Sequence, residues 1–189
     1  MNTQVWWHLT RASAIVAWFM AFGSILLGVL LSTRAMKGID RPAWLLDLHQ
    51  WLGALTCWFT GVHLVTLVAD SYITYTVADL FVPFSHPYKT TPVALGIVAM
   101  YLLLAVQGTS LMMKKLPKTL WRRIHMLSYL MFALITVHGI TAGSDTGKPW
   151  FTGISTMLAM VGAAVGGIRF VKGRWRPASR ANRSPSISK

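Results

Sequence analysis

Four of the six histidines lie inside long apolar runs, and they form two pairs with similar spacing. His49 and His63 are 14 residues apart in one run, while His125 and His138 are 13 residues apart in another. At ~1.5 Å per residue of helix, these separations are ~21 Å and ~20 Å, so both runs offer imidazoles at two matching depths. Neutral imidazole is a good iron ligand, and two imidazoles fill both axial positions of a haem. Each depth can therefore hold one haem.

The runs that carry these histidines are typical of an integral membrane protein. The 189-residue chain is 54% hydrophobic and 12% charged, with a mean hydropathy of +0.51, which is outside the range of ordinary soluble domains. Five apolar windows are long enough to cross a hydrocarbon core of ~30 Å. We predict an all-α integral membrane fold with about five transmembrane helices in a haem-binding bundle. The windows cover about residues 6–32, 44–69, 92–113, 119–142 and 150–171.

Charge in the connecting segments predicts the orientation. The net charge of +13 could suggest nucleic acid, but the basic residues sit mostly between or after the apolar runs, so no nucleic-acid partner is expected. Basic residues dominate the first and third connections and the tail, whereas the second and fourth connections have no positive excess. We therefore predict a multi-pass protein of the cell membrane with the N-terminus outside and the C-terminus in the cytoplasm. His49 and His125 then lie near the inner surface, and His63 and His138 near the outer one.

The angular positions of the histidines agree less well with ideal helices. At ~100° per residue, His63 falls within ~40° of His49, but His138 falls ~140° from His125. Either the fourth helix is distorted, or its two haems are approached from different sides. Glycines near the histidines would let a flat macrocycle approach the backbone closely. These glycines are Gly53, Gly61 and Gly139.

Several motifs together resemble the ferric reductase-like transmembrane domain, a superfamily that includes the haem domains of NADPH oxidases and ferric reductases and the haem subunit of periplasmic methionine sulfoxide reductase. The resemblance lies in the two histidine pairs, in the segment Trp121-Arg-Arg-Ile-His-Met-Leu-Ser-Tyr129, in His138-Gly139 and in Arg11-Ala-Ser-Ala, and it covers about residues 6–171. It implies an inner haem b on His49 and His125 and an outer haem b on His63 and His138. Oxidases of the superfamily have six spans with the ligands on the third and fifth, whereas here the ligands are on the second and fourth.

Two arginines are candidate partners for the acidic edges of these haems. Arg11 lies inside the first span, where a charge requires a partner, and it would either extend toward the outer surface or pair with a propionate of the outer haem. Arg122 and Arg123 precede the inner ligand His125 by less than a turn. Both can serve as positive anchors at the inner surface, and we assign Arg123 as the one that pairs with an inner propionate.

The sequence predicts an electron-transfer cytochrome b subunit. Residues 1–171 would form the haem domain and residues 172–189 a basic, disordered cytoplasmic tail. We find no G-x-G-x-x-G motif after a strand, so no flavin is expected in this chain, and the electron donor would be a separate flavoprotein or a quinol. The acceptor would be an extracytoplasmic molecule or redox protein. The alternative is a transporter or proton relay without haem that uses the intramembrane histidines.

Overall fold

The computed structural model describes residues 3–33, 43–71 and 73–174, and in these ranges it contains helices and no strands. The helices are α1 (Thr3–Thr33), α2 (Ala43–Ala69), α3 (Val77–Phe81), α4 (Thr90–Leu111), α5 (Lys118–Ala142) and α6 (Pro149–Arg174). The prediction of an all-α membrane bundle is confirmed. Each long helix starts and ends within about three residues of a predicted apolar window, because an unbroken apolar run can satisfy its backbone groups in a membrane only as a helix.

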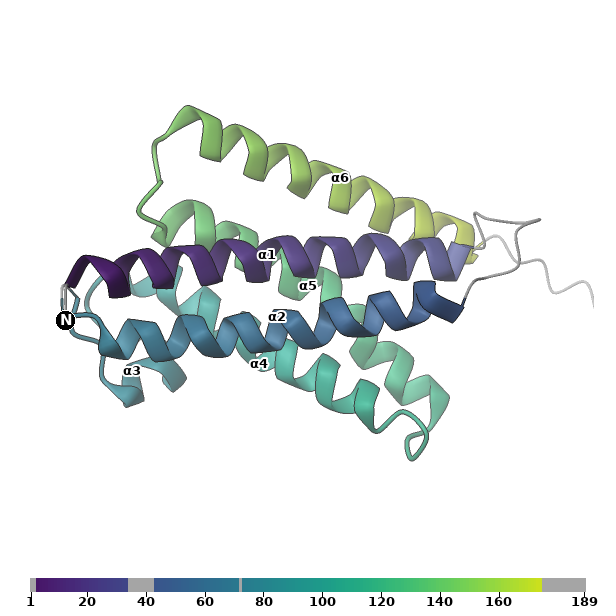
Figure 1. Ribbon diagram of the computed structural model, residues 1–189. Helices are drawn as coiled ribbons and strands as arrows, with labels where there is room; N and C mark the ends of the chain where they lie inside the picture. Colours follow the sequence, from purple (N-terminus) through teal and green to yellow (C-terminus); the bar gives the residue numbers. More distant parts are fainter. Residues whose placement is uncertain (1–2, 34–42, 72, 175–189) are drawn as a thin grey trace, which may run out of the picture.

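The predicted count of five spans is not confirmed. Within the described residues, four helices are long and apolar enough to cross a membrane: Gln4–Thr33, Ala43–Ala69, Thr90–Leu111 and Lys118–Ala142. The fifth predicted window does form a helix, α6, but α6 is not among those four. It lies alongside α1 and contacts both α1 and α5 (Figure 1).

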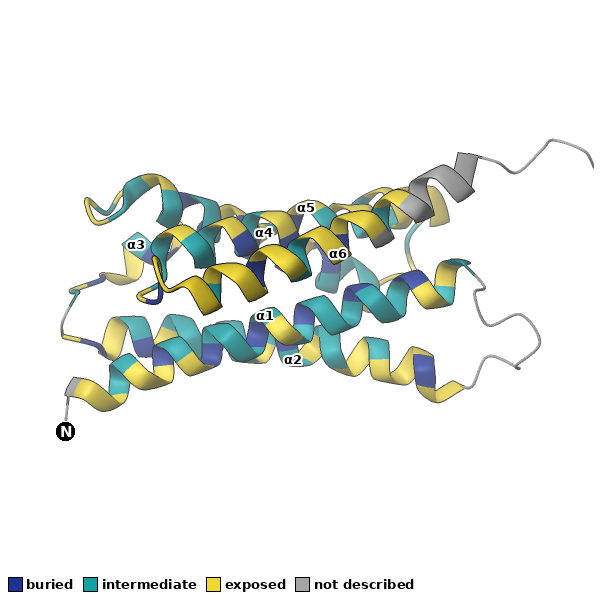
Figure 2. Cartoon of the chain, turned by 90° about the horizontal axis from the view of Figure 1, so that it is seen from above, coloured by how far each residue is buried: buried dark blue, intermediate teal, exposed yellow. Residues whose placement is uncertain are grey.

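The long helices pack as two hairpins. The contacts within the pair α1 and α2, and within the pair α4 and α5, are dense, while contacts between the hairpins are sparse (Figure 1). A small apolar core joins the hairpins through Ala21 and Ile25 on α1, Ala99 and Leu103 on α4, and Met131 and Phe132 on α5. The exposed residues lie mainly on the outward faces of the helices (Figure 2), as expected for a bundle surrounded by lipid.

The segment between α2 and α4 folds into a cap at one end of the bundle. Its short helix α3 starts with a reciprocal capping box, in which Thr76 and Asp79 bond each other's backbone amides. The cap is fixed to both α4 and α5, because the Tyr101 hydroxyl donates to Phe81 O (2.7 Å) and the Lys89 ammonium donates to the last carbonyls of α5. The cap lies at the same end as the start of α1 (Figure 1).

The charges that predict the orientation are only partly described. Arg34, Lys37 and Arg41 lie outside the described residues, as does the tail from residue 175 onward. The described part of the chain includes the connection between α4 and α5, in which Lys114, Lys115 and Lys118 are exposed. The predicted orientation stays a prediction. His49 with His125 is the inner pair, and His63 with His138 is the outer pair.

Candidate functional site

The inner pair lies between the two hairpins. His49 on α2 and His125 on α5 have ring centroids 6.0 Å apart, and their ring planes are inclined by 70°. Trp121, one turn before His125 on the same helix, stacks on the His125 ring with a centroid distance of 5.2 Å. Trp121 therefore limits the freedom of an inner histidine ring.

Hydrogen bonds to neighbouring helices orient both inner rings. His49 Nδ1 lies 2.9 Å from the backbone oxygen of Ser24 on α1, and since a carbonyl can only accept, Nδ1 carries the hydrogen. His125 Nδ1 lies 3.3 Å from the Ser110 hydroxyl on α4. That hydroxyl donates to Val106 O (2.7 Å), so its oxygen is available to accept from His125. Both inner imidazoles thus have their Nδ1 atoms engaged by the partner helix of their own hairpin.

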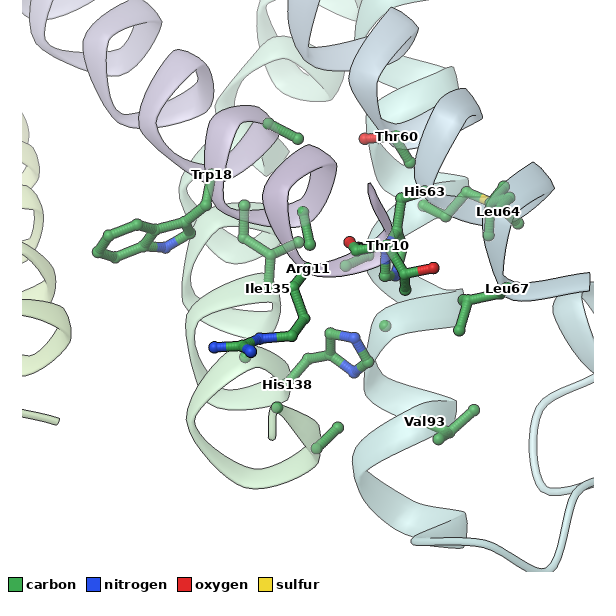
Figure 3. A pocket seen from close by; sticks show the side chains of 18 of the residues that line it. Thr10, Arg11, Trp18, Thr60, His63, Leu64, Leu67, Val93, Ile135 and His138 are labelled. Atoms are coloured by element: carbon green, nitrogen blue, oxygen red, sulfur yellow. Dashed lines mark hydrogen bonds between the residues drawn. The ribbon is translucent and has the colours of Figure 1, made fainter. Parts of the chain in front are cut away.

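The outer pair lines a cavity of about 260 Å³ (Figure 3). His63 enters it from α2 and His138 from α5, with Thr10 and Arg11 of α1 at its border (Figure 3). His63 Nδ1 donates to Thr10 O (3.0 Å), and His138 Nδ1 donates to Pro92 O (2.7 Å) on α4. The cap covers this cavity through Ile73, Tyr75, Leu80 and Tyr88.

Two glycines let a histidine approach a neighbouring helix closely. A Cβ atom on Gly96 of α4 would lie 2.7 Å from His138 Nδ1, closer than side chains tolerate. A Cβ atom on Gly28 of α1 would lie 3.2 Å from His49 Cε1. The sequence analysis did not select these two glycines, because they are on helices that carry no histidine ligand candidates.

The glycines that the sequence analysis did select have other surroundings. Gly61 and Gly139 have no atom within 4 Å of an added Cβ, and Gly139 lies in the wall of the outer cavity. Gly53 instead faces the side-chain amide of Gln107 on α4, whose Oε1 would be 3.0 Å from a Cβ at position 53. Space for a flat group is therefore present beside the outer pair at Gly139, whereas Gly53 accommodates a protein side chain.

The acceptors are spaced differently in the two hairpins. On α1 the acceptors Thr10 and Ser24 are 14 residues apart, the same separation as His63 and His49 on the antiparallel helix α2. On α4 the acceptors Pro92 and Ser110 are 18 residues apart, which is about five complete turns and returns to the same face. Helix α5 is uninterrupted between Lys118 and Ala142, so its two rings leave the helix on different sides and both reach α4.

The outer cavity has a charged border. Arg11 Nη2 lies 2.5 Å from Asp145 Oδ2, and Lys148 Nζ lies 2.8 Å from Asp145 Oδ1. The Asp145 side chain is only 5% exposed, so this carboxylate requires both cations. The pKa of Asp145 is held below its ordinary value chiefly by the hydrogen bond from Lys148, with a further contribution from Arg11, although burial acts in the opposite direction. The partner of Arg11 in the protein is therefore a loop carboxylate that the sequence analysis did not identify.

Two polar groups beside this ion pair are left without a partner. Among the described residues, Arg11 Nε and Thr10 Oγ1 are buried and make no hydrogen bond, and both residues border the outer cavity. Arg123, the other predicted propionate partner, is exposed near the start of α5. Among the described residues, His, Cys, Asp and Glu side chains form no group of three or more that could hold a metal ion.

Four intramembrane histidines, contributed by two hairpins, place the chain in the class of membrane helix bundles with a candidate functional site inside the membrane. Comparison with known families assigns the chain within that class: the family described as the ferric reductase like transmembrane component matches residues 5–136. The chain belongs to this family. The match includes His49, His63 and His125 and ends two residues before His138. No curated protein and no solved structure matches the chain.

Proposed function

We propose that the chain is a transmembrane electron-transfer module that binds two b-type haems, the inner one through His49 and His125 and the outer one through His63 and His138. Family membership supports electron transfer across a membrane. The observation that carries the haem assignment is the common hydrogen-bond pattern, in which the Nδ1 atom of each histidine is engaged by an oxygen of an adjacent helix. Such a bond fixes the tautomer in which Nε2 is the metal-binding nitrogen, and it raises the basicity of the ligand.

The separation of the inner rings supports the same assignment. Metal–imidazole bonds are about 2 Å long, so two rings that bind one metal from opposite sides have their bonded nitrogens about 4 Å apart and their centres further apart. The 6.0 Å between the centroids of His49 and His125 leaves room for one metal ion. Contacts between the two hairpins are sparse, and we propose that the macrocycle lies between them.

The polar border of the outer cavity supports binding of a group with an acidic edge. Thr10 Oγ1 and Arg11 Nε are buried donors without a partner in the described chain, and unpaired buried donors cost free energy. A propionate would accept from them while Arg11 keeps its ion pair with Asp145. Arg123, exposed near the start of α5, is our proposed counterpart for the inner haem.

The histidines determine what chemistry the site can perform. Haem iron with two imidazole ligands exchanges single electrons without an open coordination position. The protein holds the rings at two levels, which suits transfer of electrons between the two faces of the membrane. We propose a flavoprotein or a quinol as donor and an extracytoplasmic molecule or redox protein as acceptor, so the chain would act as one subunit of an oxidoreductase system.

A pyridine haemochrome assay on the purified protein tests this proposal directly. We expect two haems b per chain and a six-coordinate, low-spin spectrum, because each iron would have two imidazoles. A protein that stays colourless after reconstitution with excess haem would exclude the haem assignment and leave a relay or transport role for the histidines. One haem per chain would remove one of the two levels.

A further inference from the structure

The amide of Gln107 is a polar group inside the bundle that the histidine pairs do not use. Gln107 lies on α4 within a helix apolar enough to cross the membrane. In the part of the chain that the structure describes, its side chain makes no hydrogen bond, whereas the hydroxyls of Thr109 and Ser110 are satisfied by carbonyls of their own helix. An unpaired polar side chain in a membrane interior is costly, so its presence there calls for a function.

The Gln107 amide lies close to the inner histidine pair. Gln107 is three residues before Ser110, the hydrogen-bond partner of His125, so the two side chains share a face of α4. The amide also faces Gly53 on α2, which is four residues after His49. Gln107 therefore lies about one turn, or ~5–6 Å along the axis, from the inner pair on the side toward the outer pair.

The oxygen of the Gln107 amide is its atom nearest to α2. Oε1 is the atom nearest to Gly53, at 3.0 Å from the position of an added Cβ, while Nε2 is 4.0 Å from it. The oxygen thus packs against α2, and an NH2 group turned toward the inner pair would place the positive end of the amide dipole beside the inner cofactor. The positive end of an amide dipole stabilises an added electron, and it acts strongly where the dielectric constant is low.

We propose that Gln107 sets the reduction potential of the inner haem, raising it relative to an apolar residue at the same position. This inference rests on the proposed function, because it requires a haem on His49 and His125. It goes beyond that function because it predicts that one side chain makes the reduction potentials of the two haems differ. Gln107 acts through its dipole and does not ligate iron.

Redox titration of the purified holoprotein, followed by haem absorbance, tests the role of Gln107. The variant Gln107→Met keeps a side chain of similar length and removes the dipole. We expect the inner potential to fall, with a threefold to tenfold change in the reduction equilibrium, where tenfold corresponds to 59 mV for one electron. The outer potential should not change. The inner haem is identified as the one lost in His49→Ala.

A control and a second variant separate the dipole from packing. Thr109→Val removes a nearby hydroxyl that is bonded to its own helix, and it should leave both potentials unchanged. Gly53→Ala places a methyl group 3.0 Å from Oε1 and displaces the amide without removing it, so it should change the inner potential by less than Gln107→Met does. This second variant keeps the test usable if Gln107→Met does not assemble.

The outcomes distinguish this inference from the proposed function. Absence of haem from the wild-type protein would end the proposed function, and this inference with it. Two haems whose potentials are the same in wild type and Gln107→Met would overturn the role of Gln107 alone. So would a rise of the inner potential, or an equal shift of both potentials, because each contradicts a local dipole with its NH2 group toward the inner level.

Discussion

The inner and outer histidine pairs are supported by different kinds of acceptor. At the outer level, both Nδ1 atoms donate to backbone carbonyls, those of Thr10 and Pro92. At the inner level, His125 depends on the side-chain hydroxyl of Ser110, while His49 has both the carbonyl and the hydroxyl of Ser24. A carbonyl cannot be removed by substituting its residue, so the outer support is built into the helices, whereas part of the inner support can change by a single mutation.

The surroundings of the outer and inner histidine rings also differ. The outer rings border a cavity covered by the cap and closed at its edge by the ion pair of Arg11 and Asp145. The inner rings lie near an exposed basic connection, and the Trp121 indole packs on one of them. A carbonyl acceptor gives its histidine more basic character, which favours oxidised iron. We expect the outer haem to have the lower potential of the two, a difference that Gln107 increases.

The largest effects should come from replacing the histidines themselves. His49→Ala and His125→Ala should each remove the inner haem, and His63→Ala and His138→Ala should each remove the outer one, because iron with one imidazole loses its six-coordinate, low-spin state. Haem content and redox titration of the four variants measure this. Loss of the same haem in His49→Ala and His63→Ala would contradict the assignment of the histidines to two levels.

The next largest effects should come from the two glycines that contact histidines. Gly96→Ala requires His138 to move, since the added Cβ would be 2.7 Å from Nδ1, and it should break the bond to Pro92 and lower outer haem affinity by 10–100-fold. Gly28→Ala should affect the inner haem less, because its 3.2 Å contact to His49 requires a shift of only a few tenths of an ångström. Haem retention during dilution measures both.

A glycine with open surroundings serves as the control for this pair. Gly153 of α6 has no atom within 4 Å of an added Cβ, so Gly153→Ala should retain both haems with wild-type affinity. If Gly96→Ala and Gly28→Ala behaved like Gly153→Ala, the close packing of histidines against α1 and α4 would have no role in haem binding.

The sequence predicts the ligand candidates better than it predicts their supports. Histidines in apolar runs are rare enough to be noticed, and their depths follow from helix rise alone, without tertiary structure. The 14-residue spacing of Thr10 and Ser24 is also present in the sequence, but it had no meaning until α1 and α2 were known to be antiparallel neighbours. The acceptor at Pro92 was not predictable, because any residue offers a carbonyl and only packing decides which one is used.

The partner of Arg11 illustrates a second limit. Sequence analysis correctly requires a partner for a charge in a membrane span, but Asp145 is 134 residues away in a connecting loop. Nothing in the spacing relates the two residues, because the loop conformation brings the carboxylate to α1. The short cap helix α3 was likewise not predicted, since five residues are too few to give a periodic apolar pattern.

A smaller effect on inner haem affinity should come from Ser110 and Ser24, the two serines that bond the inner histidines. Ser110→Ala removes the acceptor that His125 uses and should lower inner haem affinity by about tenfold. Ser24→Ala removes a hydroxyl but keeps the Ser24 carbonyl that accepts from His49, so its effect should be weaker. Haem dissociation rates measure the difference. Equal losses in the two variants would show that the hydroxyls act through something other than ring orientation.

The smallest effect should appear at the border of the outer cavity and depend on pH. Because the pKa of Asp145 is lower in the folded chain than its ordinary value, the charged carboxylate stabilises the fold above that ordinary value, and this contribution is lost as the pH falls through the lowered pKa. We expect Asp145→Asn to lower the unfolding free energy by about 1 kcal/mol at neutral pH, since Arg11 and Lys148 are both partly exposed. The difference from wild type should shrink in acid, below about pH 4.

Thermal unfolding in detergent across pH measures this difference in stability, with Asp47→Asn as the control for an exposed carboxylate on α2. A destabilisation by Asp145→Asn that stays constant into strong acid would show that its charge is not what stabilises the loop. Both haem spectra should be retained at neutral pH, because Asp145 lies in the ion pair at the border of the outer cavity and would ligate neither iron.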